Sequence, residues 1–380
     1  MEFKNLQLED VIVLEDKKRK PLSTMDRSKR KGIYPYYGAQ EIIDSIDDYI
    51  FDGKYIILAE DGENLKSRKK DLVKIVEGKF WLNNHAHIFK VKEDVDLEYL
   101  YYYLLKLDLS EYITGSTQPK LNQENMNKIK IKLPGLKIQK NISKILSNID
   151  GKIKLNNEIN NNLHEIAENL FKYVYEKGKK CKLQELISNV STGSRPKGGA
   201  ETSGIPSVGA EKIEKFGIYN YSSEKYISEE YFNKLKTGII KSGDVLLYKD
   251  GAYTGKVSMA LNGFPHDKCA ANEHVFIINT EDNWAKYYLY FTLYNQENRN
   301  KIFTMASSKA AQPGLNQSEL KTLDIKLADK KEIIKFEKKV ESIMFKIAHN
   351  TLQNKILERL RDTLLPKLMN GEIDLDNIEI

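Results

Sequence analysis

The sequence contains few groupings of residues that could carry out catalysis. Residues 251–256 resemble a phosphate-binding loop, but this segment is one residue short of the G-x-x-x-x-G-K-[ST] pattern and is followed by Val257 instead of a hydroxyl residue. His85 and His87 have the spacing of a metal pair, but no cysteine or carboxylate cluster with ligand spacing accompanies them. We therefore predict no catalytic residue, no metal site and no cofactor bound by this chain.

Basic and polar residues instead gather in short segments, where they could bind phosphates or base edges of DNA. The candidates in the first half are Arg27, Lys29, Arg30, Lys66, Arg68 and Lys69, and those in the second half are Ser194, Arg195, Lys197, Lys249 and Lys256. A solvated charged surface is the alternative interpretation of each cluster. Their recurrence in both halves favours DNA binding.

A long internal repeat gives these clusters a common frame. The Gln-Pro-x-Leu-Asn-Gln pattern at residues 118–123 recurs 194 residues later at 312–317, and residues 57–62 resemble 246–251. Further upstream, His87 and the two residues after it resemble His274 and its successors, which favours a structural role for His87. The chain is therefore predicted to be a tandem duplication.

The repeated motif supplies a second set of DNA-binding candidates. They are Gln118, Lys120, Asn122, Gln312 and Asn316, together with Ser307, Ser308 and Lys309 just upstream of the second copy. The two asparagines have an alternative role, because each could cap the helix that is expected to follow it.

Each half is expected to end in a long helix. Apolar residues from Ile138 to Leu170 recur at alternating steps of four and three, and the pattern continues 194 residues later from Phe336 to Leu364. Such a seam predicts two long helices that pair in an antiparallel coiled coil. Four polar residues interrupt the seam at matching places and could fix its register: Lys152, Asn156, Lys346 and Asn350. The alternative is that they mark solvated stretches of two separate helices.

These elements predict an α/β (α+β) fold with two globular lobes and two helices. Residues 1–134 form the first lobe, 135–177 the first helix, 178–328 the second lobe, 329–368 the second helix and 369–380 a C-terminal tail. Tyrosines such as Tyr101 and Tyr287 recur in both lobes and are expected in the cores.

Composition narrows the class of protein. The chain has 60 Lys and Arg against 54 Asp and Glu, which leaves a net charge of +6 that permits a nucleic-acid partner without requiring one. Two cysteines are too few for a disulfide framework. The N-terminal residues lack the apolar segment of a signal peptide, and no apolar run approaches the ~18 residues of a membrane span. We therefore expect a cytoplasmic protein.

In five segments the sequence resembles the specificity subunit of type I restriction-modification systems, and the resemblance covers essentially the whole chain. The segments are residues 34–39, 115–122, 133–134, 204–206 and 364–373. The start of the second helix departs from the family pattern, with Ala328 and Asp329 where Leu-Pro is typical.

The resemblance implies that each lobe is a target recognition domain, which reads one half of a bipartite, asymmetric double-stranded DNA target. The helices would set the gap between the half-sites and dock two methyltransferase subunits. Restriction-motor subunits are a further implied partner. S-adenosylmethionine, ATP and Mg²⁺ would belong to the partners. The family also implies a circular, pseudo-two-fold arrangement, in which residues 369–380 meet the N-terminal segment around residues 6–8 and residues 183–186 repeat that segment.

Two other functions remain open at this point. The chain could be a coiled-coil scaffold for proteins without DNA readout, or the specificity part of a related system that only methylates. A self-sufficient restriction or methylation enzyme is disfavoured by the missing motifs.

Overall fold

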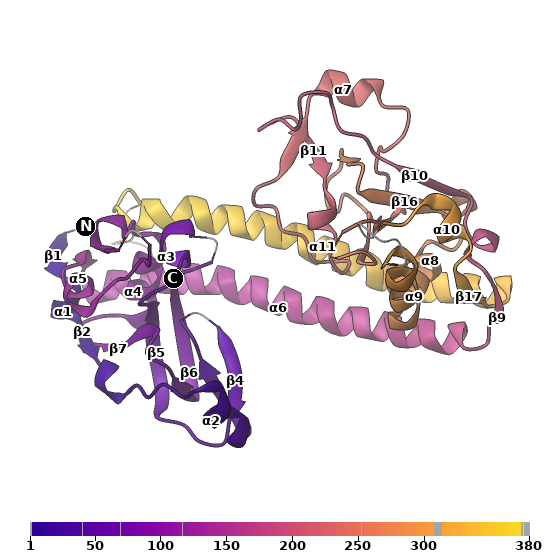
Figure 1. Ribbon diagram of the computed structural model, residues 1–380. Helices are drawn as coiled ribbons and strands as arrows, with labels where there is room; N and C mark the ends of the chain where they lie inside the picture. The colour runs from indigo at the N-terminus through magenta and orange to yellow at the C-terminus, as the bar shows by residue number, and fades with distance from the viewer. Residues whose placement is uncertain are drawn as a thin grey trace. The chain divides into compact units, whose positions relative to one another are not determined.

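The structure is a computed structural model that describes residues 2–39, 41–68, 70–115, 117–251, 253–307, 314–373 and 375 (Figure 1). The chain divides into two units. Unit 1 comprises residues 1–151 and 359–380, and unit 2 comprises residues 152–358.

Unit 1 is built on a six-stranded sheet. In order across the sheet, its strands are β2 (Ile12–Leu14), β7 (Ala86–Val91), β5 (Phe51–Ala59), β6 (Val73–Leu82), β3 (Lys31–Tyr37) and β4 (Ile42–Ile46). Successive side chains of a strand point to opposite faces, so the apolar run of β5 feeds two cores. Ile56 and Leu58 enter one core, whereas Tyr55 and Ile57 enter another.

Short elements complete unit 1. They are β1 (Phe3–Gln7), which pairs with β8 (Lys130–Pro134), and the helices α1 (Leu8–Val11), α2 (Thr24–Lys29), α3 (Asn64–Ser67), α4 (Leu97–Lys106) and α5 (Gln123–Asn127). Leu375 from the C-terminal tail packs in the same core as Leu8 and Val11 from the N-terminal segment.

Unit 2 contains three small sheets. In order, their strands are β10 (Asn189–Thr192), β16 (Val275–Asn279), β13 (Val245–Tyr248) and β14 (Val257–Met259); β12 (Lys225–Ile227), β11 (Ile205–Val208) and β15 (Ala270–Ala271); and β17 (Asp324–Leu327) with β9 (Lys179–Lys182). Its short helices are α7 (Glu229–Lys234), α8 (Lys286–Tyr294), α9 (Gln296–Ser307) and α10 (Gln317–Lys321). Tyr287 of α8, which the sequence placed in a core, is buried, as is Tyr288, and Tyr101 packs partly buried against the core of unit 1.

Hydrogen bonds confirm the predicted duplication. The backbone N–H of Leu8 donates to the carbonyl of Ile129 at 2.8 Å, and the N–H of Leu183 donates to the carbonyl of Leu323 at 2.9 Å. These bonds lie beside equivalent strand pairs, β1 with β8 and β9 with β17. Leu183 therefore occupies in unit 2 the place of Leu8 in unit 1.

One detail of the predicted repeat is wrong. Ala59 pairs with Ala86 in unit 1, and Tyr248 pairs with Val275 in unit 2. Tyr248 follows Ala59 by 189 residues, and Val275 follows Ala86 by the same number. At this offset His274 matches His85 and not His87. The sequence favours His87 as the match of His274 because similar apolar residues follow both histidines. The strand register shows that the match is His85.

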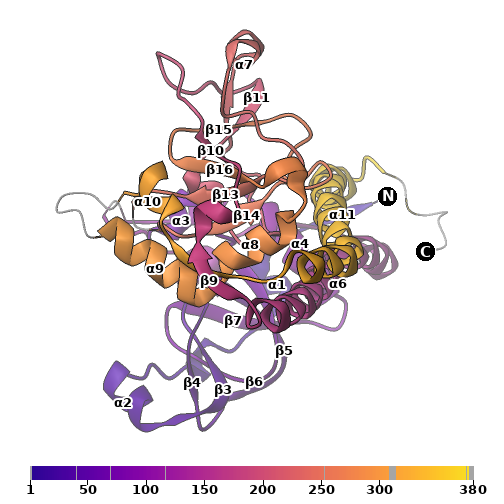
Figure 2. The same cartoon turned by 90° about the vertical axis from the view of Figure 1, so that its right-hand side faces the viewer.

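The two long helices are α6 (Leu136–Tyr175) and α11 (Lys330–Met369), each with 40 residues. Asn156 donates to Asn354 at 2.8 Å, and Asn350 donates to Asn160 at 2.9 Å, so residue numbers fall along α11 as they rise along α6. Figure 2 shows the end of α6 beside the start of α11 in unit 2. The predicted fold of mixed helices and sheets with antiparallel long helices is confirmed.

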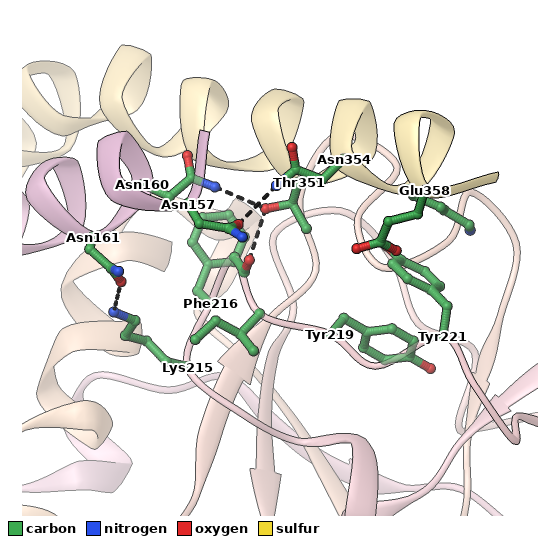
Figure 3. Close-up of a pocket in the computed structure, with 13 residues that line it drawn as sticks. Asn157, Asn160, Asn161, Lys215, Phe216, Tyr219, Tyr221, Thr351, Asn354 and Glu358 are labelled. Carbon is green, nitrogen blue, oxygen red and sulfur yellow. Dashed lines mark hydrogen bonds between the residues drawn. The ribbon is translucent and has the colours of Figure 1, made fainter. Parts of the chain in front are cut away.

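The polar layer between these helices is partly different from the prediction. Asn156 and Asn350 are buried, with 1% of each residue exposed, but Lys152 and Lys346 are exposed. The buried layer contains asparagines, because their amides exchange hydrogen bonds across the helix pair, whereas a buried ammonium would lack a partner charge. Figure 3 shows Asn160 and Thr351 facing one another from the two helices.

The apolar seam of α6 also shifts by one residue after Asn156. The buried positions are then Asn160, His164, Ala167 and Phe171, and Ile166 from the predicted seam is 50% exposed. A straight helix turns about 20° per heptad relative to a 3.5-residue seam, so a fixed seam cannot stay buried along 40 residues. The search for apolar residues missed this change because two of the buried residues are polar.

No helix within the described ranges is both long and apolar enough to cross a membrane.

Candidate nucleic-acid interface

The repeated motif of unit 1 lies against the end of β5. The N–H of Leu121 donates to the carbonyl of Glu60 at 2.8 Å, and Lys120 exchanges two backbone hydrogen bonds of 2.8 Å with Thr114. The N–H of Gly62 donates to the carbonyl of Pro119 at 3.3 Å. The backbone is thus fixed on both sides, and the side chains of Gln118 and Lys120 are exposed.

Unit 2 holds its copy of the motif in the same way. The N–H of Leu315 donates to the carbonyl of Lys249 at 2.9 Å, and Asp250 bridges to Gly314. Gly314 stands at the position of Lys120. Four predicted contacts lie outside the described residues: Lys69, Ser308, Lys309 and Gln312.

The asparagines of the motif are helix caps. The Asn122 side chain accepts from the N–H of Asn125 at 2.8 Å at the start of α5, and the Asn316 side chain accepts from the N–H of Glu319 at 2.8 Å at the start of α10. The capping role that the sequence allowed is confirmed. A contact of either asparagine with DNA stays a prediction.

A histidine and an aspartate pair beside each copy of the motif. Nδ1 of His85 lies 2.9 Å from Oδ2 of Asp61, and Nδ1 of His274 lies 2.8 Å from Oδ1 of Asp250. Both partners are related by the same offset of 189 residues. The sequence patterns did not indicate this contact, and the wrong partner for His274 concealed its duplication.

The backbone around each histidine is also repeated. Asn83 accepts from the N–H of His85, and Asn272 accepts from the N–H of His274, both at 2.9 Å. The carbonyls of these histidines accept from the N–H of Glu60 at 2.9 Å and of Lys249 at 3.2 Å. Each turn is thus tied to the strand that carries the aspartate.

In unit 1 the Asp61–His85 pair and the motif line one cavity of about 420 Å³. Thr117, Gln118 and Lys120 contribute polar side chains from the motif, and Glu63 contributes a carboxylate from the turn before α3. The cavity can therefore exchange hydrogen bonds with a polar ligand at several points. We call this surface the unit 1 motif site, and we call the surface around His274 and Asp250 the unit 2 motif site.

Lys120 is partly neutralised within the fold. Its Nζ lies 3.2 Å from Oε1 of Glu60, while 53% of its side chain is exposed. Burial raises the pKa of Glu60, but the hydrogen bond from Arg19, the charge of His87 and the hydrogen bond from Lys120 outweigh it, so the pKa lies below its usual value. Glu60 keeps its charge, and Arg19 can balance that charge when Lys120 turns toward a ligand.

Asp16, Glu60 and His87 form the one cluster of possible metal ligands that the described residues contain. The guanidinium of Arg19 forms ion pairs with both carboxylates, at 3.1 Å to Asp16 and 2.7 Å to Glu60. His87 is bound on both sides, by Asp16 at 2.6 Å and by the carbonyl of Leu121 at 2.8 Å. We therefore assign the cluster to the fold and not to a metal.

Two predicted arginines of α2 and its C-terminal cap hold this helix on the sheet. Arg27 donates to the carbonyl of Leu22 at 2.7 Å and lies 5.1 Å from the ring of Tyr36. Arg30 pairs with Asp47 at 2.9 Å and lies over a tryptophan ring at 5.0 Å. Lys29 is exposed and has no hydrogen bond or ion pair with any described residue. It is therefore better placed for a phosphate than either arginine.

The remaining predicted residues of unit 1 lie near the motif site along the chain. Lys66 lies exposed on α3, three residues after Glu63. Arg68 has a left-handed backbone with φ of 49° and donates to the carbonyl of Leu107 at 3.1 Å.

In unit 2, predicted residues gather around His274. Arg195 pairs with Glu273 at 2.9 Å, and Lys249 lies 3.4 Å from Asp250. Nε2 of His274 lies 3.4 Å from Glu273, so these five residues form one continuous chain of ionisable side chains.

Four other predicted residues of unit 2 lie apart from this chain of ionisable side chains. Ser194 shares a hydrogen bond of 2.8 Å with Tyr231, and Lys256 pairs with Glu214. Lys197 is exposed, and Ser307 is the exposed last residue of α9.

Three comparisons bear on the family. The family model of the type I restriction modification DNA specificity domain matches residues 1–165 and again residues 178–362. A putative type I restriction enzyme specificity subunit of Haemophilus influenzae is 28% identical over 255 residues, which are 64% of this chain and 64% of that protein, slightly less than two thirds of its length. The type I restriction enzyme MjaIX specificity subunit of Methanocaldococcus jannaschii is 26% identical over 315 residues, 76% of this chain and 71% of that protein.

Among solved structures, the S subunit of a type I restriction-modification system from M. genitalium has the same fold. Its TM-score is 0.66 at 14% identity, over 97% of this chain and 96% of that chain. Since the family model matches both halves, the chain belongs to the type I restriction-modification specificity subunits and carries two copies of their DNA specificity domain.

Proposed function

We propose that each unit reads one half of a bipartite, asymmetric DNA target. The observation that carries the proposal is that the two motif sites share a backbone frame but differ in side chains. Glu60 is matched by Lys249, and Lys120 is matched by Gly314. The same frame with different donors, acceptors and charges favours different base sequences.

We further propose that α6 and α11 set the gap between the half-sites, because each helix supplies residues to both units. Exposed apolar side chains on these helices support docking of protein partners, since such residues are candidates for contact surfaces. They are Leu155, Ile166 and Tyr173 on α6, and Ile334, Phe345, Ile356 and Leu360 on α11. The proposed partners are two methyltransferase subunits, with restriction-motor subunits as a further partner.

In this proposal the chain supplies specificity and no catalysis. S-adenosylmethionine would bind to the methyltransferase subunits, and ATP with Mg²⁺ would bind to the motor subunits. The described motif sites support this division, because their histidines and Lys120 are paired with carboxylates of the same unit.

The test is to co-produce the chain with its methyltransferase partner and to sequence the modified adenines in the host DNA. We expect a motif of two specified parts separated by an unspecified gap. Replacing both Gln118 and Lys120 by Ala should relax or abolish the first part and leave the second part unchanged. A methylated motif without a gap contradicts the proposal. A chain that binds no duplex DNA even at low salt, while still binding partners, would favour a protein scaffold.

A further inference from the structure

The Asp–His pair is present in both units, although neighbouring side chains differ between them. This suggests that the pair has the same role in each unit. Asp61–His85 and Asp250–His274 have nearly equal Nδ1–O distances, 2.9 and 2.8 Å. The charged residue before each aspartate is Glu60 in one unit and Lys249 in the other. The pair is thus kept while a neighbour changes sign.

The aspartate fixes the direction of each imidazole ring. An ionised carboxylate only accepts hydrogen bonds, so Nδ1 carries the hydrogen that lies between the two groups. The opposite nitrogen, Nε2, is directed away from the aspartate. Nε2 of His85 has no partner within the described ranges, and 52% of this side chain is exposed. His274 is 41% exposed.

A group common to both units cannot distinguish two different half-sites, so its ligand must be common to both. The DNA backbone has this property, whereas the base edges differ between half-sites. The lining of the unit 1 motif site supports a polar ligand, since Thr117, Gln118 and Lys120 offer donors next to His85. A protein partner would be expected to bury aromatic or aliphatic side chains at the centre of its contact.

We propose that His85 and His274 each donate a hydrogen bond from Nε2 to a phosphate of the DNA backbone, at equivalent places in the two half-sites, with Asp61 and Asp250 as positioning residues. The proposal rests on the proposed function in DNA recognition. Both ring nitrogens then carry hydrogen, so each contact favours the protonated ring.

Other charged groups face the two rings and affect how strongly the protonated ring is favoured. His85 shares its cavity with Asp61, Glu63 and Lys120. His274 faces Asp250 through Nδ1 and Glu273 through Nε2.

The two contacts are not equally strong in this proposal. Glu273 lies 3.4 Å from Nε2 of His274 and 2.9 Å from Arg195, while Asn84 stands at the equivalent position in unit 1. A phosphate at His274 must displace the Glu273 carboxylate. Glu273→Asn should therefore strengthen DNA binding and make the second half-site behave like the first.

The experiment measures the affinity of the full chain with its methyltransferase partner for the duplex found by methylation sequencing. His85→Gln and His274→Gln are each expected to weaken binding about three- to tenfold, as for loss of one hydrogen bond. His349→Gln is the matched control, because His349 is an exposed histidine of α11 outside both motif sites. The control should bind like the wild type.

Neutral methylphosphonate linkages identify the partner of each ring. One such linkage in the first half-site should weaken wild-type binding and cause no further loss in His85→Gln, with the corresponding result for His274→Gln in the second half-site. Wild-type affinity should fall as the pH rises from 5.5 to 8, and each variant should show a smaller fall. The ratio of cognate to non-cognate affinity should stay constant.

Several outcomes would overturn the inference. A changed ratio of cognate to non-cognate affinity would assign the histidines to base readout. Loss of the methyltransferase subunit at unchanged DNA affinity would assign them to a protein contact. Variants that bind like His349→Gln, or that lose only thermal stability, would show that the Asp–His pair is purely structural.

Asp61→Asn, which keeps the side-chain shape, should reproduce part of the His85→Gln loss of affinity. If the wild-type complex binds no duplex at all, the proposed function itself has failed.

Discussion

The carboxylate of Glu337 on α11 accepts a hydrogen bond of 2.7 Å from the backbone N–H of Tyr288 on α8. A second bond of 3.3 Å comes from the N–H of Tyr287. Ala285, at the N-terminal cap of α8, has no side chain that could fill this role. The long helix thus supplies the missing cap of a lobe helix, which fixes α8 on α11.

Unit 1 solves the same problem with a different residue. Asp96 caps α4 by accepting from the N–H of Tyr99 at 2.9 Å, and Ser143 of α6 donates to Asp96. The repeat offsets of 189 and 194 relate Asp96 to Ala285 and Ser143 to Glu337. Unit 1 thus has the carboxylate on the cap residue, whereas unit 2 has it on the long helix, and in both units it accepts hydrogen bonds from the start of the lobe helix.

The first prediction concerns the stability of unit 2 as a function of pH. Burial raises the pKa of Glu337 to about 8, against the opposing effect of the two backbone hydrogen bonds and of Lys286. The folded state then holds a proton that the unfolded state releases near pH 4.5. Stability from this group is therefore complete below pH 4.5 and is lost as the pH rises to about 8, by at most about 1.4 kcal/mol per pH unit.

Glu337→Gln tests this prediction, because glutamine keeps an acceptor and does not titrate. The difference in Tm between wild type and variant should change steadily between pH 5 and 8 in favour of the variant. Parallel Tm curves would contradict the shifted pKa. Glu337→Ala should lower Tm at every pH, since the N-terminus of α8 then lacks its cap.

A second prediction concerns a buried histidine of α6. Burial, with a smaller effect of the nearby Lys215 charge, lowers the pKa of His164 to about 3. The ring is neutral in the folded protein, and its Nε2 shares a hydrogen bond of 2.8 Å with the Tyr290 hydroxyl. Stability from this group is present above pH 6.5 and is lost as the pH falls from 6.5 toward 3.

His164→Phe keeps an aromatic ring against Tyr290 and cannot titrate. The variant should lose about 1–3 kcal/mol at neutral pH, because the buried Tyr290 hydroxyl loses the hydrogen bond to His164. Its Tm should fall less than that of the wild type when the pH is lowered from 7 to 4.5. Equal acid sensitivity of the two proteins would show that His164 does not carry this effect.

A third prediction concerns the asparagine layer between the long helices. Asn160 accepts from Asn350 at 2.9 Å and donates to Thr351 at 3.2 Å. Asn160→Leu leaves the buried Asn350 amide without its acceptor and should lower the free energy of unfolding by about 1–3 kcal/mol. The double variant with Asn350→Leu should lose less than the sum of the single losses, because it removes both partners. Asn162→Leu, at an exposed position of the same helix, is the control.

The sequence was sufficient for the duplication and the long helices for physical reasons. Each depends on many residues in order, such as the motif at 118–123 with its copy at 312–317 and the apolar seam from Ile138 to Leu170. A pattern that many residues form together is still recognised when a few of its positions are assigned wrongly. The two asparagine caps were also predictable, because the cap residue acts on its own neighbouring backbone.

Features that depend on contacts between distant segments were not predictable. The partner of His274 could be His85 or His87 by sequence, and only the pairing of Tyr248 with Val275 decides between them. In unit 2 the cap of α8 comes from Glu337, 52 residues after Ala285, so the sequence around Ala285 does not reveal it. The Asp–His pairs were missed for the same reason.

A fourth prediction uses the caps of the motif. Asn122→Ala and Asn316→Ala should each lower the free energy of unfolding by about 1 kcal/mol, because each removes an acceptor for the first turn of α5 or α10. The losses should add, since the two residues lie in different units and share no partner. Glycine at either position should cost only a few tenths of a kcal/mol. Denaturant titration measures all of these values. Losses that fail to add would reveal coupling between the motifs.

The last prediction addresses DNA binding by Lys120, whose Nζ lies 3.2 Å from Glu60 while 53% of the side chain is exposed. Lys120→Ala should leave the fold intact, because Arg19 still pairs with Glu60 at 2.7 Å. It should weaken binding of the complex to DNA and reduce the slope of log affinity against log salt by about one ion. Lys128→Ala is the matched control, since Lys128 is 55% exposed and pairs with Glu124 on α5. An unchanged salt slope in Lys120→Ala, or an equal change in the control, would remove Lys120 from the interface.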